Sequence, residues 1–135
     1  MEILHYNVTH GLYFILPKTE DERQMFTMDV VLEEETFHAR VEIRYLAAPD
    51  QWVISIWDHS SGELLVNMVP LICSYGIVND LMAPFQYLRG GKGMGSLWVM
   101  RAVDEPETVD PAEGTLGQFN LVFGSKLDGP RSVAS

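Results

Sequence analysis

The chain has 135 residues, of which 47% are hydrophobic and 21% are charged, and this fits one globular domain with a single core. Its formal net charge of −10 disfavours specific nucleic-acid binding and binding to anionic membranes, because both surfaces repel a negative protein. The sequence shows neither a secretory leader nor a long apolar run, so we expect synthesis in a reducing cytoplasm and no membrane insertion.

The first half of the sequence alternates apolar and polar side chains with a period of two, as half-buried strands do. An apolar strand is predicted at 12–16, and longer strands at 26–32 and 36–45 are predicted to pair as a hairpin. The outward side chains of the 36–45 strand are His38, Arg40, Glu42 and Arg44. We expect this face to be wetted by solvent and the opposite face to enter the core.

A second hairpin is predicted from strands at 52–57 and 63–69, joined by a polar turn at 58–62. Gly62 is placed in this turn to take the positive φ that most other residues avoid. Alternation puts Trp57 on the outward face of its strand, where a large aromatic ring is typical of a contact patch.

The middle of the chain has mixed signals. Residues 70–75 are apolar and fit either a further strand or a crossing between sheets. Residues 79–84 could begin a short helical turn, which Pro84 would stop. The glycine-rich segment 90–95 predicts a flexible loop.

Two more strands, at 96–103 and 116–123, flank an acidic and proline-containing surface loop at 104–114. The total of about seven to nine strands, at most one short helix and mainly hairpin connections predicts an all-β protein, a single antiparallel β-barrel or sandwich.

The predicted organisation is one β-domain at 12–123. Residues 1–11 are expected to be an N-terminal extension or arm. Residues 124–135 are small and polar, and are expected to be a flexible C-terminal tail.

The candidate motifs for chemistry fail on spacing. Residues 58–61 contain the residue types of a hydrolytic triad, but neighbouring strand side chains point to opposite faces. The segment 90–95 is no phosphate-binding loop, because glycine follows Lys92 where Ser or Thr is needed. The carboxylates of 104–113 do not match a calcium loop, and the histidines lack metal-binding spacing. We expect no catalytic, cofactor or metal site; a small hydrolase using His59 is the weakest alternative.

Cys73 is the only cysteine, which excludes an internal disulfide and a cysteine-based metal cluster. It lies in the apolar run 71–73, so a buried structural thiol is expected. The tryptophans Trp52 and Trp98, with five tyrosines, could line a cavity, although a β-sheet core uses aromatic residues in the same way. The main alternative function is therefore a small-molecule or carbohydrate-binding β-barrel without catalysis.

A set of landmarks follows the chain in a characteristic order. They are Gln24-x-Phe26, Arg44-Tyr45, Trp52, Asp58, Gly62, Pro70-Leu71, Leu81-x-x-Pro84, Gly95-x-Leu97, Asp110-Pro111, Leu116-Gly117 and Leu121-x-Phe123. In this order, over roughly 12 to 123, the sequence resembles the baseplate plug family of contractile-tailed bacteriophages.

The resemblance implies a non-enzymatic structural virion protein of the central tail baseplate, made in the host cytoplasm. Such a plug sits with the hub and spike at the distal end of the tail tube and helps to close the lumen until infection. The implied partners are hub, spike and tail-tube proteins, with a homo-oligomer around the tail axis. The predicted contact residues are Arg40, Arg44 and Trp57 on the outward strand faces and Lys92 in the glycine-rich loop.

Overall fold

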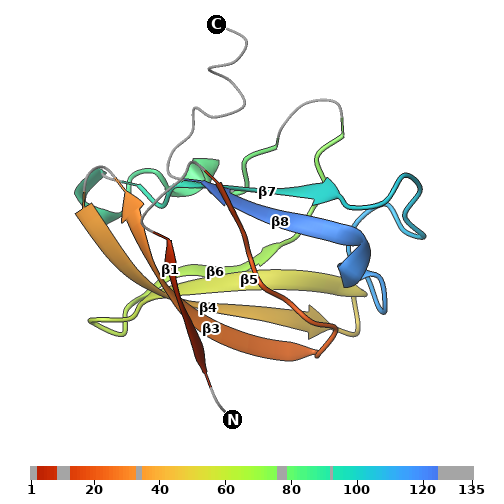
Figure 1. Cartoon of the computed structure of the whole chain (residues 1–135), viewed down its shortest axis with the longest axis horizontal. Helices are drawn as coiled ribbons and strands as arrows, with labels where there is room; N and C mark the ends of the chain where they lie inside the picture. The colour runs from red at the N-terminus through yellow and green to blue at the C-terminus, as the bar shows by residue number, and fades with distance from the viewer. Residues whose placement is uncertain (1–2, 9–12, 33–34, 76–78, 92, 125–135) are drawn as a thin grey trace, which may run out of the picture.

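The computed structural model describes residues 3–8, 13–32, 35–75, 79–91 and 93–124. Within them, eight strands form two open sheets that pack face to face, with three one-turn 3₁₀ helices in the connections (Figure 1). The strands are β1 (Leu4–Val8), β2 (Tyr13–Ile15), β3 (Arg23–Leu32), β4 (Glu35–Leu46), β5 (Gln51–Asp58), β6 (Leu64–Pro70), β7 (Ser96–Arg101) and β8 (Phe119–Gly124). The 3₁₀ helices are η1 (Ala83–Phe85), η2 (Arg89–Gly91) and η3 (Leu116–Gln118). The predicted all-β class is confirmed, and the open sheets make the fold sandwich-like rather than a closed barrel.

The larger sheet has the strand order β1-β3-β4-β5-β6. Both predicted hairpins are present, since β3 pairs antiparallel with β4, and β5 with β6. β1 forms one edge of this sheet and pairs parallel with β3, with Leu4 opposite Phe26. The ring of Tyr6 packs edge-on against Phe26 at a centroid distance of 5.7 Å, so an aromatic contact supports this parallel ladder.

The core lies between this sheet and the smaller one, whose order is β2-β8-β7. The inward side chains of β4 are Phe37, Ala39, Val41 and Ile43, all buried. From the facing sheet, β8 contributes Phe119, Leu121 and Phe123. Burying a large apolar side chain stabilises the fold by roughly 1.5–3 kcal/mol, so the alternation selects the face that turns inward. The predicted inward faces of both strands are confirmed.

The ladder between β5 and β6 is interrupted by a bulge. Ile54 pairs with Val69 and Ile56 with Val66, so Asn67 and Met68 lie opposite the single residue Ser55. Met68 has a φ of 51°, and its N–H donates a hydrogen bond of 2.9 Å to Ser55 Oγ. The buried Ser55 hydroxyl thus partners a backbone group that the bulge takes out of the ladder.

The chain crosses from the larger to the smaller sheet after Pro70, which ends β6. Leu71 N–H donates to Trp52 O at 2.9 Å in the larger sheet, and Ser74 N–H donates to Val99 O at 2.8 Å in the smaller one. Of the two options for 70–75, a crossing is therefore observed. The prediction that Pro84 stops a helical turn is wrong: Pro84 lies at the start of η1, where a missing N–H costs nothing.

The glycine-rich segment is held against η1. Gln86 Nε2 donates hydrogen bonds to Met82 O and Gly95 O, at 2.9 and 2.8 Å. Gly93 has a φ of 79°, and a Cβ there would clash with Gln86 Oε1. The backbone conformation at Gly93 favours glycine, and a Cβ there would push the Gln86 amide away from its two hydrogen bonds.

The acidic loop between β7 and η3 is tied to the larger sheet at its second half. Trp52 Nε1–H donates a hydrogen bond of 2.7 Å to Ala112 O, and the N–H of Glu113 donates to Asp50 Oδ1 at 2.9 Å. The same Asp50 oxygen accepts from the Tyr45 hydroxyl at 2.5 Å, which is the main reason that the pKa of Tyr45 rises to about 12. The turn between β4 and β5 and the acidic loop therefore stay together.

Candidate functional site

The outer face of the larger sheet carries three of the four predicted contact residues. Arg40 and Arg44 extend outward from β4, and Trp57 lies on β5 directly opposite Arg40 in the ladder. Trp57 is partly buried and Arg44 is exposed. The fourth predicted residue, Lys92, lies outside the described part of the chain. We call Arg40, Arg44 and Trp57 the outer-face patch.

Arg40 and Trp57 form one unit of this patch. The guanidinium carbon of Arg40 lies 4.8 Å from the centroid of the Trp57 ring, a cation–π geometry. Arg40 Nε is buried and has no hydrogen-bond partner among the described residues. An unmade hydrogen bond at a buried donor is costly, so this Nε makes the conformation of Arg40 less stable.

Arg44 differs from the nearby Arg23, which is paired. Arg23 Nε donates to Glu42 Oε2 at 2.6 Å, and the Glu42 side chain is only 8% exposed. The prediction that this face is wetted is therefore wrong for Glu42, because the long Arg23 side chain covers it. Arg44 has no ion pair among the described residues, so its charge is available to a partner.

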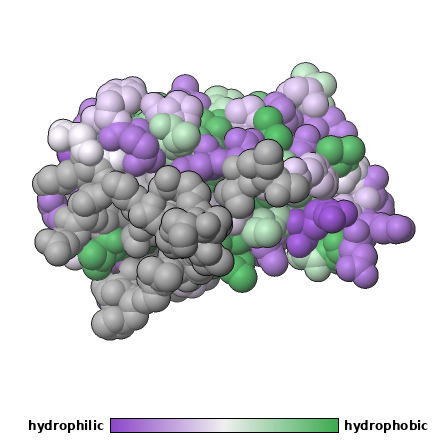
Figure 2. Space-filling view, turned by 90° about the horizontal axis from the view of Figure 1, so that it is seen from above, coloured by the Kyte–Doolittle hydropathy of each residue, from purple (hydrophilic) through white to green (hydrophobic). Residues whose placement is uncertain are grey.

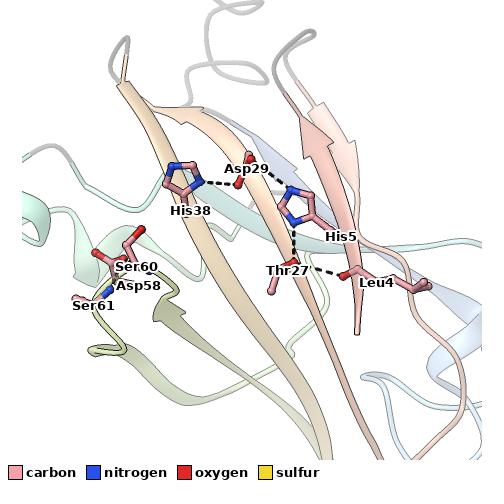
Figure 3. Close-up of polar contacts among 8 residues, drawn as sticks. All are labelled: Leu4, His5, Thr27, Asp29, His38, Asp58, Ser60 and Ser61. Atoms are coloured by element: carbon pink, nitrogen blue, oxygen red, sulfur yellow. Dashed lines mark hydrogen bonds and ion pairs between the residues drawn. The ribbon is translucent and has the colours of Figure 1, made fainter. Parts of the chain in front are cut away.

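A second polar group joins three neighbouring strands of the same face (Figure 3). Asp29 of β3 lies between His38 of β4, 2.7 Å from Oδ1, and His5 of β1, 3.3 Å from Oδ2. His5 also lies 2.7 Å from the Thr27 hydroxyl. Burial alone would raise the pKa of Asp29, but the hydrogen bonds and charges of His38 and His5 outweigh it and lower this pKa. The group therefore fastens the edge strand β1 to the sheet.

Sequence alternation placed His38 on the outward face, but it did not predict that Asp29 and His5 join it. The reason is the parallel pairing of β1 with β3, which the sequence does not signal with any short turn. The one signal in the sequence was general: outward residues that face each other on neighbouring strands prefer opposite charges.

The turn at 58–61 has a structural role. Asp58 Oδ1 accepts hydrogen bonds from the backbone N–H groups of Ser60 and Ser61, at 2.9 and 3.4 Å (Figure 3). Gly62 follows with a φ of 81°, as predicted. The Asp58 carboxylate therefore closes the turn, as Asx turns do.

The features that suggested ligand binding lie elsewhere. Trp52 and Trp98 are 1% and 4% exposed and belong to the core. An open groove of about 520 Å³ lies instead beside Tyr75 and Val109, at the far end of β7. The described residues contain no group of three or more His, Cys, Asp or Glu that could hold a metal ion.

Cys73 is buried, as predicted. Burial is the main cause that raises the pKa of its thiol, and the Cys73 N–H donates to Asp110 Oδ1 at 2.8 Å. A buried thiol with a raised pKa carries little of the reactive thiolate. Among the described residues, no helix is long and apolar enough to span a membrane.

The chain matches a known protein-family model. A family model described as the cyanophage baseplate Pam3 plug gp18 matches residues 13–126. No curated protein matches the chain. The matched range covers all the described strands except β1. The chain therefore belongs to this family of phage baseplate plugs, and its role is a structural one in the tail baseplate.

Proposed function

We propose that the chain is the plug at the centre of a contractile-tail baseplate. In this role it sits with the hub and spike at the distal end of the tail tube and helps to keep the lumen closed until infection. It acts by docking, without catalysis or a cofactor. Membership in the plug family supports this position.

The physical character of the chain supports the same role. The net charge of −10 limits adhesion to DNA, which suits a protein beside a DNA conduit. The two-sheet core places the outer-face patch on a rigid support. Rigid elements hold contact residues in place better than loops do.

The observation that carries the docking proposal is the outer-face patch itself. Tryptophan and arginine are the residue types most enriched among the energetically important contacts of protein interfaces. Here Arg40 is stacked on Trp57 with an unpartnered Nε, and Arg44 is exposed without an ion pair in the described part of the chain. We propose that neighbouring baseplate proteins (hub, spike, tube or further copies of the plug around the tail axis) cover this patch.

We also propose that 12–123 is the structural domain of the plug. Residues 1–11 would then act as an arm onto a neighbour, and 124–135 as a tail that a neighbour orders. Because β1 is held at the edge of this chain's own larger sheet, such an arm would reach a neighbour by sharing that edge.

The test is complementation of a phage that lacks this gene. Plasmids supply the wild type, the charge-reversed variant R40E/R44E, or K18E as a control with the same type of charge change in the segment between β2 and β3. Quantitative mass spectrometry of purified tails measures incorporation. We expect the wild type and K18E in tails and a loss of roughly tenfold or more for R40E/R44E, since each 1.4 kcal/mol of lost affinity is tenfold. Absence of the wild type from tails would contradict the plug role, and normal incorporation of R40E/R44E would contradict the docking surface.

A further inference from the structure

The groove beside Tyr75 has an apolar floor. Its lining includes Tyr75, which is 45% exposed, Val109, which is 69% exposed, and Pro106. The Tyr75 hydroxyl donates to Val109 O, and the Arg101 guanidinium stacks over the Tyr75 ring at 5.5 Å. Figure 2 shows hydrophobic side chains exposed among hydrophilic ones at the right-hand end of the molecule, where β7 ends in Figure 1. These two contacts hold the Tyr75 ring in place in the wall of the groove.

The rim of this groove carries uncompensated negative charge. The exposed side chains of Asp104, Glu105 and Glu107 lie along it, and none forms an ion pair with another described residue. The nearest cation, Arg101, donates its hydrogen bond to the backbone oxygen of Asp104 at 3.1 Å. Glu107 is held by Gln118, whose Nε2 donates to it at 3.2 Å. An occupant of this groove must bring cations together with apolar surface.

The outer-face patch supplies that combination in the same chain. Arg40 and Arg44 project from one side of β4, and their spacing of four residues separates them by about 13 Å along the strand. Trp57 adds a partly exposed aromatic ring beside Arg40. The groove lies at the end of the smaller sheet and the patch on the outer face of the larger sheet, so both can be occupied at once.

We infer that the occupant of the groove is the outer-face patch of a second copy of this chain. The carboxylates of one copy then meet Arg40 and Arg44 of the next, and apolar surface from the groove covers Trp57. Two different surfaces make such a contact heterologous, so repeated copies form a ring when the rotation closes. The inference rests on the proposed function, because it names one of the neighbours that the plug would have in the baseplate.

Electrostatics allow this contact despite the net charge of −10. At physiological salt the Debye length is about 8 Å, so repulsion between whole molecules is screened more than the contact pairs are. Complementary charges mainly set the geometry and the rate of association, while the apolar surface adds affinity. The association should therefore be reversible and should weaken as salt is raised.

The test is a charge swap with the full chain, followed by sedimentation velocity up to about 100 µM protein, a range suited to micromolar affinity. The groove variant is D104K/E105K/E107K, the patch variant is R40E/R44E, and E63K is the control carboxylate outside the groove. We expect the wild type and E63K to associate, each multiple variant alone to stay monomeric, and an equimolar mixture of the two to associate again. Circular dichroism checks that each variant is folded, and D104K/E105K, which keeps Glu107 and its contact with Gln118, replaces the groove variant if that one fails to fold.

Restored association in the mixture would show that the two surfaces contact each other. A monomeric wild type across the concentration range, or a mixture that stays monomeric although both variants are folded, would overturn the inference. Association that a charge reversal at either surface leaves unchanged would overturn it too. The plug role is judged separately by incorporation into tails, so a monomeric protein that enters tails would overturn this inference alone.

Discussion

Trp52 links the larger sheet to the acidic loop, and its replacement by phenylalanine gives a defined loss of stability. The side chain is 1% exposed, and its Nε1–H donates to Ala112 O at 2.7 Å. That carbonyl also accepts from the N–H and hydroxyl of Thr115, at 3.1 and 3.3 Å, so it keeps partners in the variant. The lost hydrogen bond should therefore cost only about 1 kcal/mol.

The smaller ring adds a packing term. Phenylalanine leaves a void of roughly 35 Å³, which at about 24 cal/mol per Å³ costs near 1 kcal/mol before relaxation. With the lost transfer free energy of the removed atoms, we expect the W52F variant to lose about 2–3 kcal/mol of unfolding free energy. Urea unfolding followed by far-ultraviolet circular dichroism measures this value, since the substitution removes a fluorophore.

The matched control is the W57F variant, the same chemical change at a partly exposed ring on the same strand. Trp57 is stacked with Arg40 rather than enclosed in the core, so this variant should lose less than about 1 kcal/mol. If W52F loses no more than W57F, then the indole of Trp52 is not a tie between the sheet and the loop, and the argument from its burial fails.

Two further predictions concern polar and backbone contacts. Because His38 and His5 lower the pKa of Asp29, its carboxylate stabilises the fold above the ordinary carboxyl pKa of about 3.9, and this contribution disappears as the pH falls through the lowered value. The unfolding free energy of the wild type should therefore fall more steeply in this acid range than that of D29N, and equal slopes in urea titrations would contradict the role of the histidines. The G93A variant should lose about 1–3 kcal/mol of unfolding free energy, which is more than G91A should lose. Both glycines have a positive φ, but of the two only Gly93 lies against Gln86. Equal shifts of the melting temperature in calorimetry would refute the clash.

Sequence alternation predicted the strands that dominate the fold because one face of each is buried. On β4 the inward residues from Phe37 to Ile43 are spaced by two, and a shift of one residue would expose them all. The same rule put Arg40, Arg44 and Trp57 on the outer face, where the structure has them.

The features that alternation missed depend on contacts between distant segments. The parallel pairing of β1 joins residues 22 apart, as Leu4 and Phe26 show, and no local turn encodes it. The bulge at Met68 depends on the Ser55 hydroxyl across the ladder. Glu42 looked exposed by position, but it is buried and paired with Arg23. Local sequence patterns predict which face of a strand is buried, whereas these three features depend on contacts with residues distant in the sequence.

The groove at the end of β7 was foreseen only as an acidic surface loop. Its charge was visible in the sequence, but its apolar floor requires Tyr75 to lie beneath residues more than thirty positions later. The hydroxyl of Tyr75 reaches Val109 O because the chain crosses between the sheets just before it. The groove can therefore be identified only from the three-dimensional path of the connection between the two sheets.

The most direct test of the account is a cryo-electron-microscopy map of the intact tail tip of the phage that encodes this chain. We expect density for the two-sheet domain at the tail axis, at the distal end of the tube, with the outer-face patch covered by a neighbouring protein. A map in which the domain is absent from the baseplate, or lies there with the patch open to solvent, would contradict it.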